Sequence, residues 1–161
     1  MVRRPPATGI SSPGVTQVHI AIAVLALALT GVTTLWGGWC WWRWRSSRWF
    51  WPLLRAAQVS VVLEALVGGI LVLLHHKAVS LHYIYGVLPI LVSFIAEQLR
   101  ISSAQMIMDS RGFATADEVG RLPAAEQQQL VRSIVRREVG VMTLAALVLF
   151  VLLGRAAMAV H

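Results

Sequence analysis

The residues of this chain whose type and position could support chemistry are four histidines and one glutamate. His19, His75, His76 and His82 lie at the ends of apolar segments, and few residues separate His76 from His82. Those two segment ends must therefore meet in a tight turn. Imidazole is a ligand of haem iron, copper and zinc, so the histidines are candidate cofactor ligands.

The residues that follow the histidines at intervals of three or four are mostly small or polar. Three such stripes are present: His19, Ala23, Ala26 and Thr30; Glu64, Gly68, Leu71 and His75; and His82, Gly86, Pro89, Ser93 and Glu97. Residues at this spacing share one face of a helix. In a membrane, faces of this kind meet other helices, because small residues permit close approach and lipid tails reject polar groups. We expect the three stripes to face one another.

A cofactor held between helices is the chemistry that these stripes favour. His19, His75 and His82 are candidate ligands of haem b, with His76 beside them, and Gly68 and Gly86 could leave room for a macrocycle. A copper or zinc ion on three imidazoles is a second interpretation, so the identity of a metal stays open. The alternative is that these histidines lie at the membrane interface and bind nothing.

Glu64 lies near the middle of an apolar segment. Inserting an acidic side chain there costs roughly 2.5–3.5 kcal/mol, which makes intramembrane acids functional candidates by default. Glu64 could carry protons or donate a hydrogen bond to a quinone. It could instead join helices through Thr30, Thr33 or Ser93. Glu97, nearer the end of its segment, is expected to pair with Arg100.

All seven tryptophans fall within the run LWGGWCWWRWRSSRWFW, between Trp36 and Trp51. Indole rings favour the headgroup layer and guanidinium groups pair with phosphates, so the run predicts an interfacial anchor. The number of tryptophans also favours a docking surface for lipid or for a larger membrane protein. The candidate docking residues are Trp39, Trp41, Trp42, Arg43, Trp44 and Arg45.

The composition identifies the elements that must position these side chains. Apolar residues make up 57% of the 161 residues and charged residues 13%, against about a quarter charged in soluble domains. Four segments are long and apolar enough to cross a bilayer: residues 18–39, 53–75, 81–99 and 139–158. Lipid leaves helices as the only spanning structure for such runs. We predict an all-α protein, an integral membrane four-helix bundle that forms a single domain over residues 18–161, with a fourth span that contributes packing only.

The distribution of basic residues predicts the orientation of the bundle. Ten arginines lie in or beside the first and third loops, and four basic residues share the side of both termini. The positive-inside rule then places both termini outside (N-out, C-out) in the cell (plasma) membrane, with multiple passes. Residues 1–17, rich in Pro, Gly and Ser, are expected to form a disordered extracytoplasmic tail.

The third loop, residues 100–138, is expected to form a cytoplasmic helical hairpin that extends the third and fourth spans. Thr115 and Glu118 have the spacing of a capping box, and Pro123 suits the first turn of a new helix. No stop signal separates that helix from the fourth span. The hairpin is interpreted as a partner-binding or stabilising element.

The leading hypothesis is that the chain is a small accessory or assembly subunit of a membrane redox complex of respiratory type. Such a subunit would either bind haem b or have no cofactor. The expected partners are anionic lipid headgroups and other membrane subunits, with no nucleic acid, since the net charge of +7 flanks apolar runs. No nucleophile–base set is discernible and Cys40 is a lone cysteine, so enzymatic activity is not expected. The alternatives are a structural scaffold without a cofactor and a proton-coupled transport component that uses Glu64.

Overall fold

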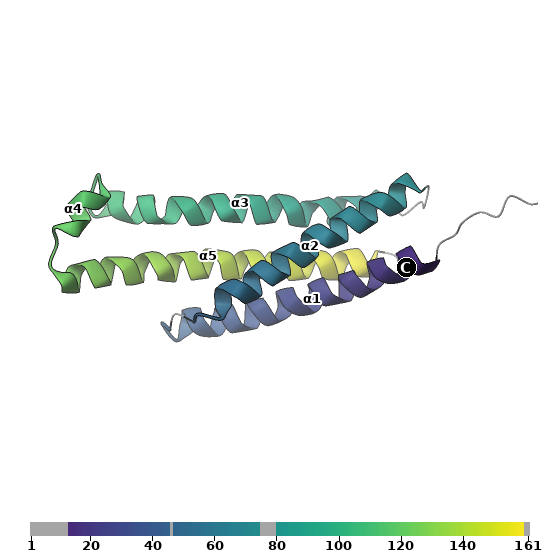
Figure 1. Cartoon of the computed structure of the whole chain (residues 1–161), viewed down its shortest axis with the longest axis horizontal. Helices are drawn as coiled ribbons and strands as arrows, with labels where there is room; N and C mark the ends of the chain where they lie inside the picture. Colours follow the sequence, from purple (N-terminus) through teal and green to yellow (C-terminus); the bar gives the residue numbers. More distant parts are fainter. Residues whose placement is uncertain (1–12, 46, 75–79, 160–161) are drawn as a thin grey trace, which may run out of the picture.

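A computed structural model of the chain describes residues 13–45, 47–74 and 80–159. Every regular element in these ranges is helical. The helices are α1 (Pro13–Trp42), α2 (Phe50–Leu73), α3 (Ser80–Ser110), the short α4 (Ala116–Gly120) and α5 (Ala124–Met158). Figure 1 shows α1, α5 and α3 side by side, with α2 running obliquely in front of α5.

The four long helices each contain an apolar stretch long enough to cross a membrane. Large apolar side chains on their outer faces remain uncovered; Leu35 and Leu73, for example, are 76% and 77% exposed. A helix surface of this kind is stable in lipid and would be a liability in water. The chain is therefore a multi-pass membrane protein of helical-bundle type.

Helix α5 is the centre of the bundle. Half of its most apolar window is buried, against 17% in α1 and α2 and 11% in α3. It packs along both α1 and α3, whereas α2 packs mainly on α1 and has few contacts with α3. The fourth span thus supplies packing, as expected, but at the centre of the bundle, and α3 packs chiefly on α5 and little on α2. The small residues of α5 explain its place, because Gly140, Thr143 and Ala146 allow neighbours to approach closely.

Glycines set the close contact between α1 and α5. A methyl group at Gly31 would lie 3.1 Å from the Phe150 ring, and one at Gly37 would overlap Thr143 and the Phe50 ring. On the other side of the interface, Gly140 lies directly under the Trp41 indole. The two helices can therefore approach this closely only because these positions carry no side chain.

The pair formed by α3 and α5 continues past the turn between α1 and α2, and α4 closes its far end (Figure 1). From Ala124 to Val139, α5 adds about 24 Å at 1.5 Å per residue. Gly112 ends α3 with a positive φ of 79°, and the Thr115 hydroxyl accepts from the Glu118 amide to cap α4. The Glu118 carboxylate accepts in turn from the Ala114 amide.

Helix α1 begins at Pro13, five residues before the expected start of the first span. Proline has no amide hydrogen and a fixed φ, so it is tolerated in the first turn of a helix, where its donor would be unpaired anyway. The helical part of the N-terminal segment is thus longer than its Pro- and Ser-rich composition predicts.

Candidate functional site

The starts of α1 and α3 and the ends of α2 and α5 meet at one end of the bundle, called here the histidine end. His19 of α1, Glu64 of α2 and His82 of α3 converge near it. The opposite end, where α1 gives way to α2 and where α3 and α5 continue outward, carries the Trp- and Arg-rich run and is called the arginine end. The two ends have distinct chemistry and are described in turn.

His19 and Glu64 form a polar contact between α1 and α2 at the histidine end. The His19 Nδ1 atom lies 3.4 Å from Glu64 Oε1, and both side chains are largely buried, at 17% and 15% exposed. The two atoms are in electrostatic contact without the alignment of a hydrogen bond. The second carboxylate oxygen, Glu64 Oε2, is buried and has no hydrogen-bond partner among the described residues. Such a pair can hold or exchange a proton.

His82 is oriented by the backbone of α5. Its Nδ1 lies 3.2 Å from the carbonyl oxygen of Ala156. A carbonyl can only accept, so this hydrogen bond requires the proton on Nδ1. In the neutral ring, Nε2 then carries the free lone pair. Metal-ligating histidines are commonly held in this way, with one ring nitrogen donating to a carbonyl or carboxylate and the other bound to the metal.

The two imidazoles are close to each other. The ring centroids of His19 and His82 are 6.3 Å apart, with an interplanar angle of 77°. Two imidazoles that share one metal ion have centroids roughly 6 Å apart, because each metal–nitrogen bond is about 2 Å. The separation therefore fits a pair of ligands, and the perpendicular rings also fit an edge-to-face contact without a ligand.

Of the two predicted glycines, Gly68 lies against His19 and Gly86 faces open space. A methyl group at Gly68 would come 3.3 Å from His19 Cε1, whereas one at Gly86 would meet nothing within 4 Å. His75 and His76 lie outside the described residues. Within the described parts of the chain, no three His, Cys, Asp or Glu side chains are grouped as a metal site would need.

Glu64 does not contact the hydroxyl groups proposed as its neutral partners. Thr30 donates to the carbonyls of Ala26 and Leu27, and Thr33 donates to that of Leu29. Threonine in a helix commonly donates to the preceding turn in this way, so the protons of these hydroxyls are not donated to Glu64. The Ser93 hydroxyl is buried with no described partner. The contact of Glu64 is His19.

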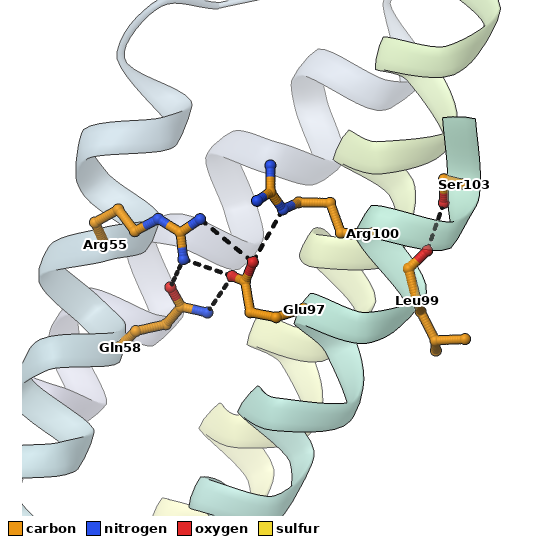
Figure 2. Close-up of polar contacts among 6 residues, drawn as sticks. All are labelled: Arg55, Gln58, Glu97, Leu99, Arg100 and Ser103. Carbon is orange, nitrogen blue, oxygen red and sulfur yellow. Dashed lines mark hydrogen bonds and ion pairs between the residues drawn. The ribbon is translucent and has the colours of Figure 1, made fainter. Parts of the chain in front are cut away.

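At the arginine end, Glu97 of α3 is the centre of a polar network (Figure 2). Its carboxylate accepts from the guanidinium groups of Arg55 on α2, at 2.5 and 3.3 Å, and of Arg100, at 2.9 Å, as well as from the amide of Gln58, at 3.0 Å. The predicted Glu97–Arg100 pair is confirmed. Arg55 and Gln58 are additional partners. Because α2 and α3 otherwise touch little, this network joins them.

The Trp- and Arg-rich run divides into two groups. Arg43 stacks over Trp39 and Trp42, with its guanidinium carbon 4.5 and 5.9 Å from the ring centroids, on the outside of the bundle. Trp41 and Trp44 turn toward α5, where Trp41 covers Gly140 and Trp44 stacks on Arg136 at 3.0 Å. The candidate docking residues therefore make their contacts in two groups, one around Arg43 and one against α5.

Sequence reasoning missed the Arg55–Glu97 bond and the Arg136–Trp44 stack. Arg55 and Glu97 are 42 residues apart, and only the shared position of both at the arginine end could have suggested the pair. Comparison with protein-family models, with curated protein sequences and with solved structures finds no match for this chain.

Proposed function

We propose that this protein is a small accessory subunit of a membrane redox complex and that His19 and His82 hold haem b or a metal ion at the histidine end. The observation that carries the proposal is the convergence of the two imidazoles at 6.3 Å, with the Nδ1 of one bonded to the Ala156 carbonyl and that of the other facing Glu64. Both rings can then present Nε2 to a metal.

The donor set fits a low-spin haem or a two-histidine metal site. Bound there, the iron would supply one-electron transfer, and His19 and His82 would be the residues that hold it. The residues of the chain would orient the ligands: the Ala156 carbonyl selects the tautomer of His82, and the Glu64 carboxylate raises the basicity of His19. Gly86, next to open space one turn from His82, leaves room beside the ligands.

An absorbance spectrum of the purified, reduced protein after haem-replete expression tests the proposal. A Soret band is expected for the wild type and for His161→Ala, which removes a histidine that the proposal does not use. His19→Ala and His82→Ala should each lose most of that band. A wild type without a Soret band and without bound metal by elemental analysis would contradict the proposal, as would single variants that retain the cofactor fully.

The role as an accessory subunit is supported by the exposed aromatic surface at the arginine end. Trp42, Trp44 and Trp49 are 75%, 72% and 64% exposed. Tryptophan is enriched where membrane proteins meet lipid and where proteins meet one another. Co-purification in mild detergent should yield an oxidoreductase subunit, whereas a chain recovered alone and cofactor-free would favour the scaffold alternative.

A second candidate, proton-coupled transport, is favoured by the buried Oε2 of Glu64 and its contact with His19. A carboxyl group and an imidazole 3.4 Å apart could pass a proton between α2 and α1. In proteoliposomes, Glu64→Gln should abolish proton flux if this role holds. Glu97→Gln, an acid at the other end, is the matched control. Equal flux in the wild type and in Glu64→Gln would exclude the role.

A further inference from the structure

A basic pocket lies at the arginine end, between the turn that follows α1 and the extended part of α3 and α5. Its volume is about 680 Å³, and it is lined by four arginines, two tryptophans and three further residues. The arginines are Arg111 from the turn that follows α3 and Arg132, Arg136 and Arg137 from α5. No acidic residue lines it. The pocket is thus a concentration of positive charge that no carboxylate in the described parts of the chain neutralises.

The four guanidinium groups have no carboxylate partner among the described residues. The ion pairs of the described chain involve His19, Arg55 and Arg100 only. Arg132 donates to the Gln128 side chain, while the buried Nε of Arg136 has no hydrogen-bond partner. Guanidinium groups that lack a carboxylate partner and are grouped around one pocket favour an anionic ligand that can accept several hydrogen bonds.

The turn that closes the pocket is held in an unfavourable backbone conformation. Trp44 has a φ of 56°, in the left-handed region that bulky residues rarely adopt. Its ring lies on Arg136, with the guanidinium carbon 3.0 Å from the centroid. Strain of this kind persists where neighbouring contacts hold it, and it collects at ligand sites. The Trp44 ring covers one face of the Arg136 guanidinium. The N–H groups at the edge of the guanidinium are then the part that can contact a ligand.

The position of the pocket identifies the source of the anion. Trp41, which lines it, covers Gly140, where the apolar part of α5 begins, and Arg136 and Arg137 come immediately before that part. The pocket is therefore level with the border between hydrocarbon and water, where lipid phosphates lie. Basic pockets between membrane helices bind polyanionic lipid headgroups.

We infer that this pocket binds the headgroup of an anionic phospholipid that carries more than one phosphate. Two guanidinium groups suffice for one phosphate, so four match a headgroup with two. The pocket is a different site from the docking surface expected in the Trp-rich run, because most of its arginines belong to α5. Binding of a headgroup in this pocket does not depend on a cofactor at the histidine end.

Native mass spectrometry of the full chain in detergent measures the binding. Diphosphatidylglycerol is the probe, with phosphatidylcholine of the same acyl chains and inorganic pyrophosphate as comparisons. The pocket variant is Arg132→Gln with Arg136→Gln. The control is Arg48→Gln with Arg121→Gln, which removes the same charge from the same end of the bundle outside the pocket. We expect the pocket variant to bind diphosphatidylglycerol at least about tenfold more weakly, and the control to match the wild type.

Equal losses in the two variants would overturn the inference, because diffuse surface charge would then explain the binding. If pyrophosphate binds as tightly as the lipid, the ligand of the pocket is a soluble anion and not a lipid. This result would also overturn the inference. A second experiment places a photo-crosslinking residue at the exposed position 129, which lines the pocket. Because it keeps all four arginines, it still tests the inference if the arginine variant fails to fold. In native membranes, a lipid adduct supports the inference and a protein adduct overturns it.

Discussion

At the scale of single residues, the chemistry of the histidine end depends on where two protons lie. The Ala156 carbonyl holds one on His82 Nδ1, and the Glu64 carboxylate faces His19 Nδ1 from 3.4 Å. Each imidazole is thereby oriented from a different helix, one from α5 and one from α2. The same arrangement suits both the proposed ligand binding and the proposed proton exchange. Variants that separate the two roles must therefore alter the orienting group and leave the imidazoles in place.

Glu64→Leu should weaken retention of a haem or metal cofactor without removing either histidine. Loss of a group that orients a ligand typically lowers metal affinity by about 10- to 100-fold. Glu64→Gln keeps a hydrogen-bond acceptor near His19 and should lose less. Titration of the apoprotein with haem, followed by absorbance, measures both affinities. Equal affinities in the wild type and in Glu64→Leu would show that the carboxylate has no orienting role.

The contact between Arg55 and Glu97 should be measurable as a coupling energy. Arg55 is 47% exposed, so solvent screens the pair, and we expect a coupling of about 0.5–1 kcal/mol. A double-mutant cycle with Arg55→Gln and Glu97→Gln, followed by unfolding in detergent, gives the value. Glu97→Gln alone should cost more than Arg55→Gln alone, because it removes the negative charge that pairs with two guanidinium groups. The reverse order would mean that Arg100 contributes nothing to the network.

At the scale of the helices, the α1–α5 interface depends on the absence of side chains at chosen positions. Adjacent glycines of α1 differ sharply in this respect. A methyl group at Gly37 would overlap Phe50 and Thr143, whereas one at Gly38 would meet nothing within 4 Å. Both positions are glycines next to each other in the same helix. A comparison of the same substitution at the two positions therefore separates the effect of packing from the effect of helix propensity.

Gly37→Ala should therefore destabilise the bundle, by roughly 1–3 kcal/mol as for other overpacked sites, because neither Phe50 nor Thr143 has room to move. Gly38→Ala should be neutral or stabilising, since alanine favours a helix over glycine by roughly 0.5–1 kcal/mol. Thermal unfolding in the same detergent compares the two. A stability loss of the same size in both would show that the helices do not approach at Gly37.

The helices themselves follow from hydropathy, and the convergence of His19 and Glu64 follows in part from their place on small-residue stripes. The stripe spacing identifies which face of each helix is polar. It does not give the neighbour that this face meets, which is why Thr30 and Thr33 were expected as partners of Glu64. The central position of α5 depends on the fit of Gly31 to Phe150 and of Gly140 to Trp41 across two helices. Such pairs become visible only when the register between helices is known.

At the scale of the whole molecule, the two ends of the bundle differ in charge as well as in chemistry. The histidine end holds a buried acid–imidazole pair, and the arginine end holds exposed indoles, the Glu97 network and the basic pocket. The extension of α3 and α5 projects from the arginine end (Figure 1). The orientation of the bundle decides which leaflet supplies lipid to the pocket and which compartment faces the cluster.

We expect the arginine end to face the cytoplasm, because ten arginines lie on that side against four basic residues on the other. A phosphatase that is active only outside the cytoplasm should work when fused after His161, and a fluorescent protein that folds only inside should fluoresce when fused after Gly120. The opposite pattern would invert the orientation. Replacing Arg43, Arg45 and Arg48 by glutamine reduces the majority from ten to seven against four, so a minor fraction of inverted molecules should then appear. If orientation were set by the bulk of the α3–α5 extension instead, these three substitutions would leave both reporters unchanged.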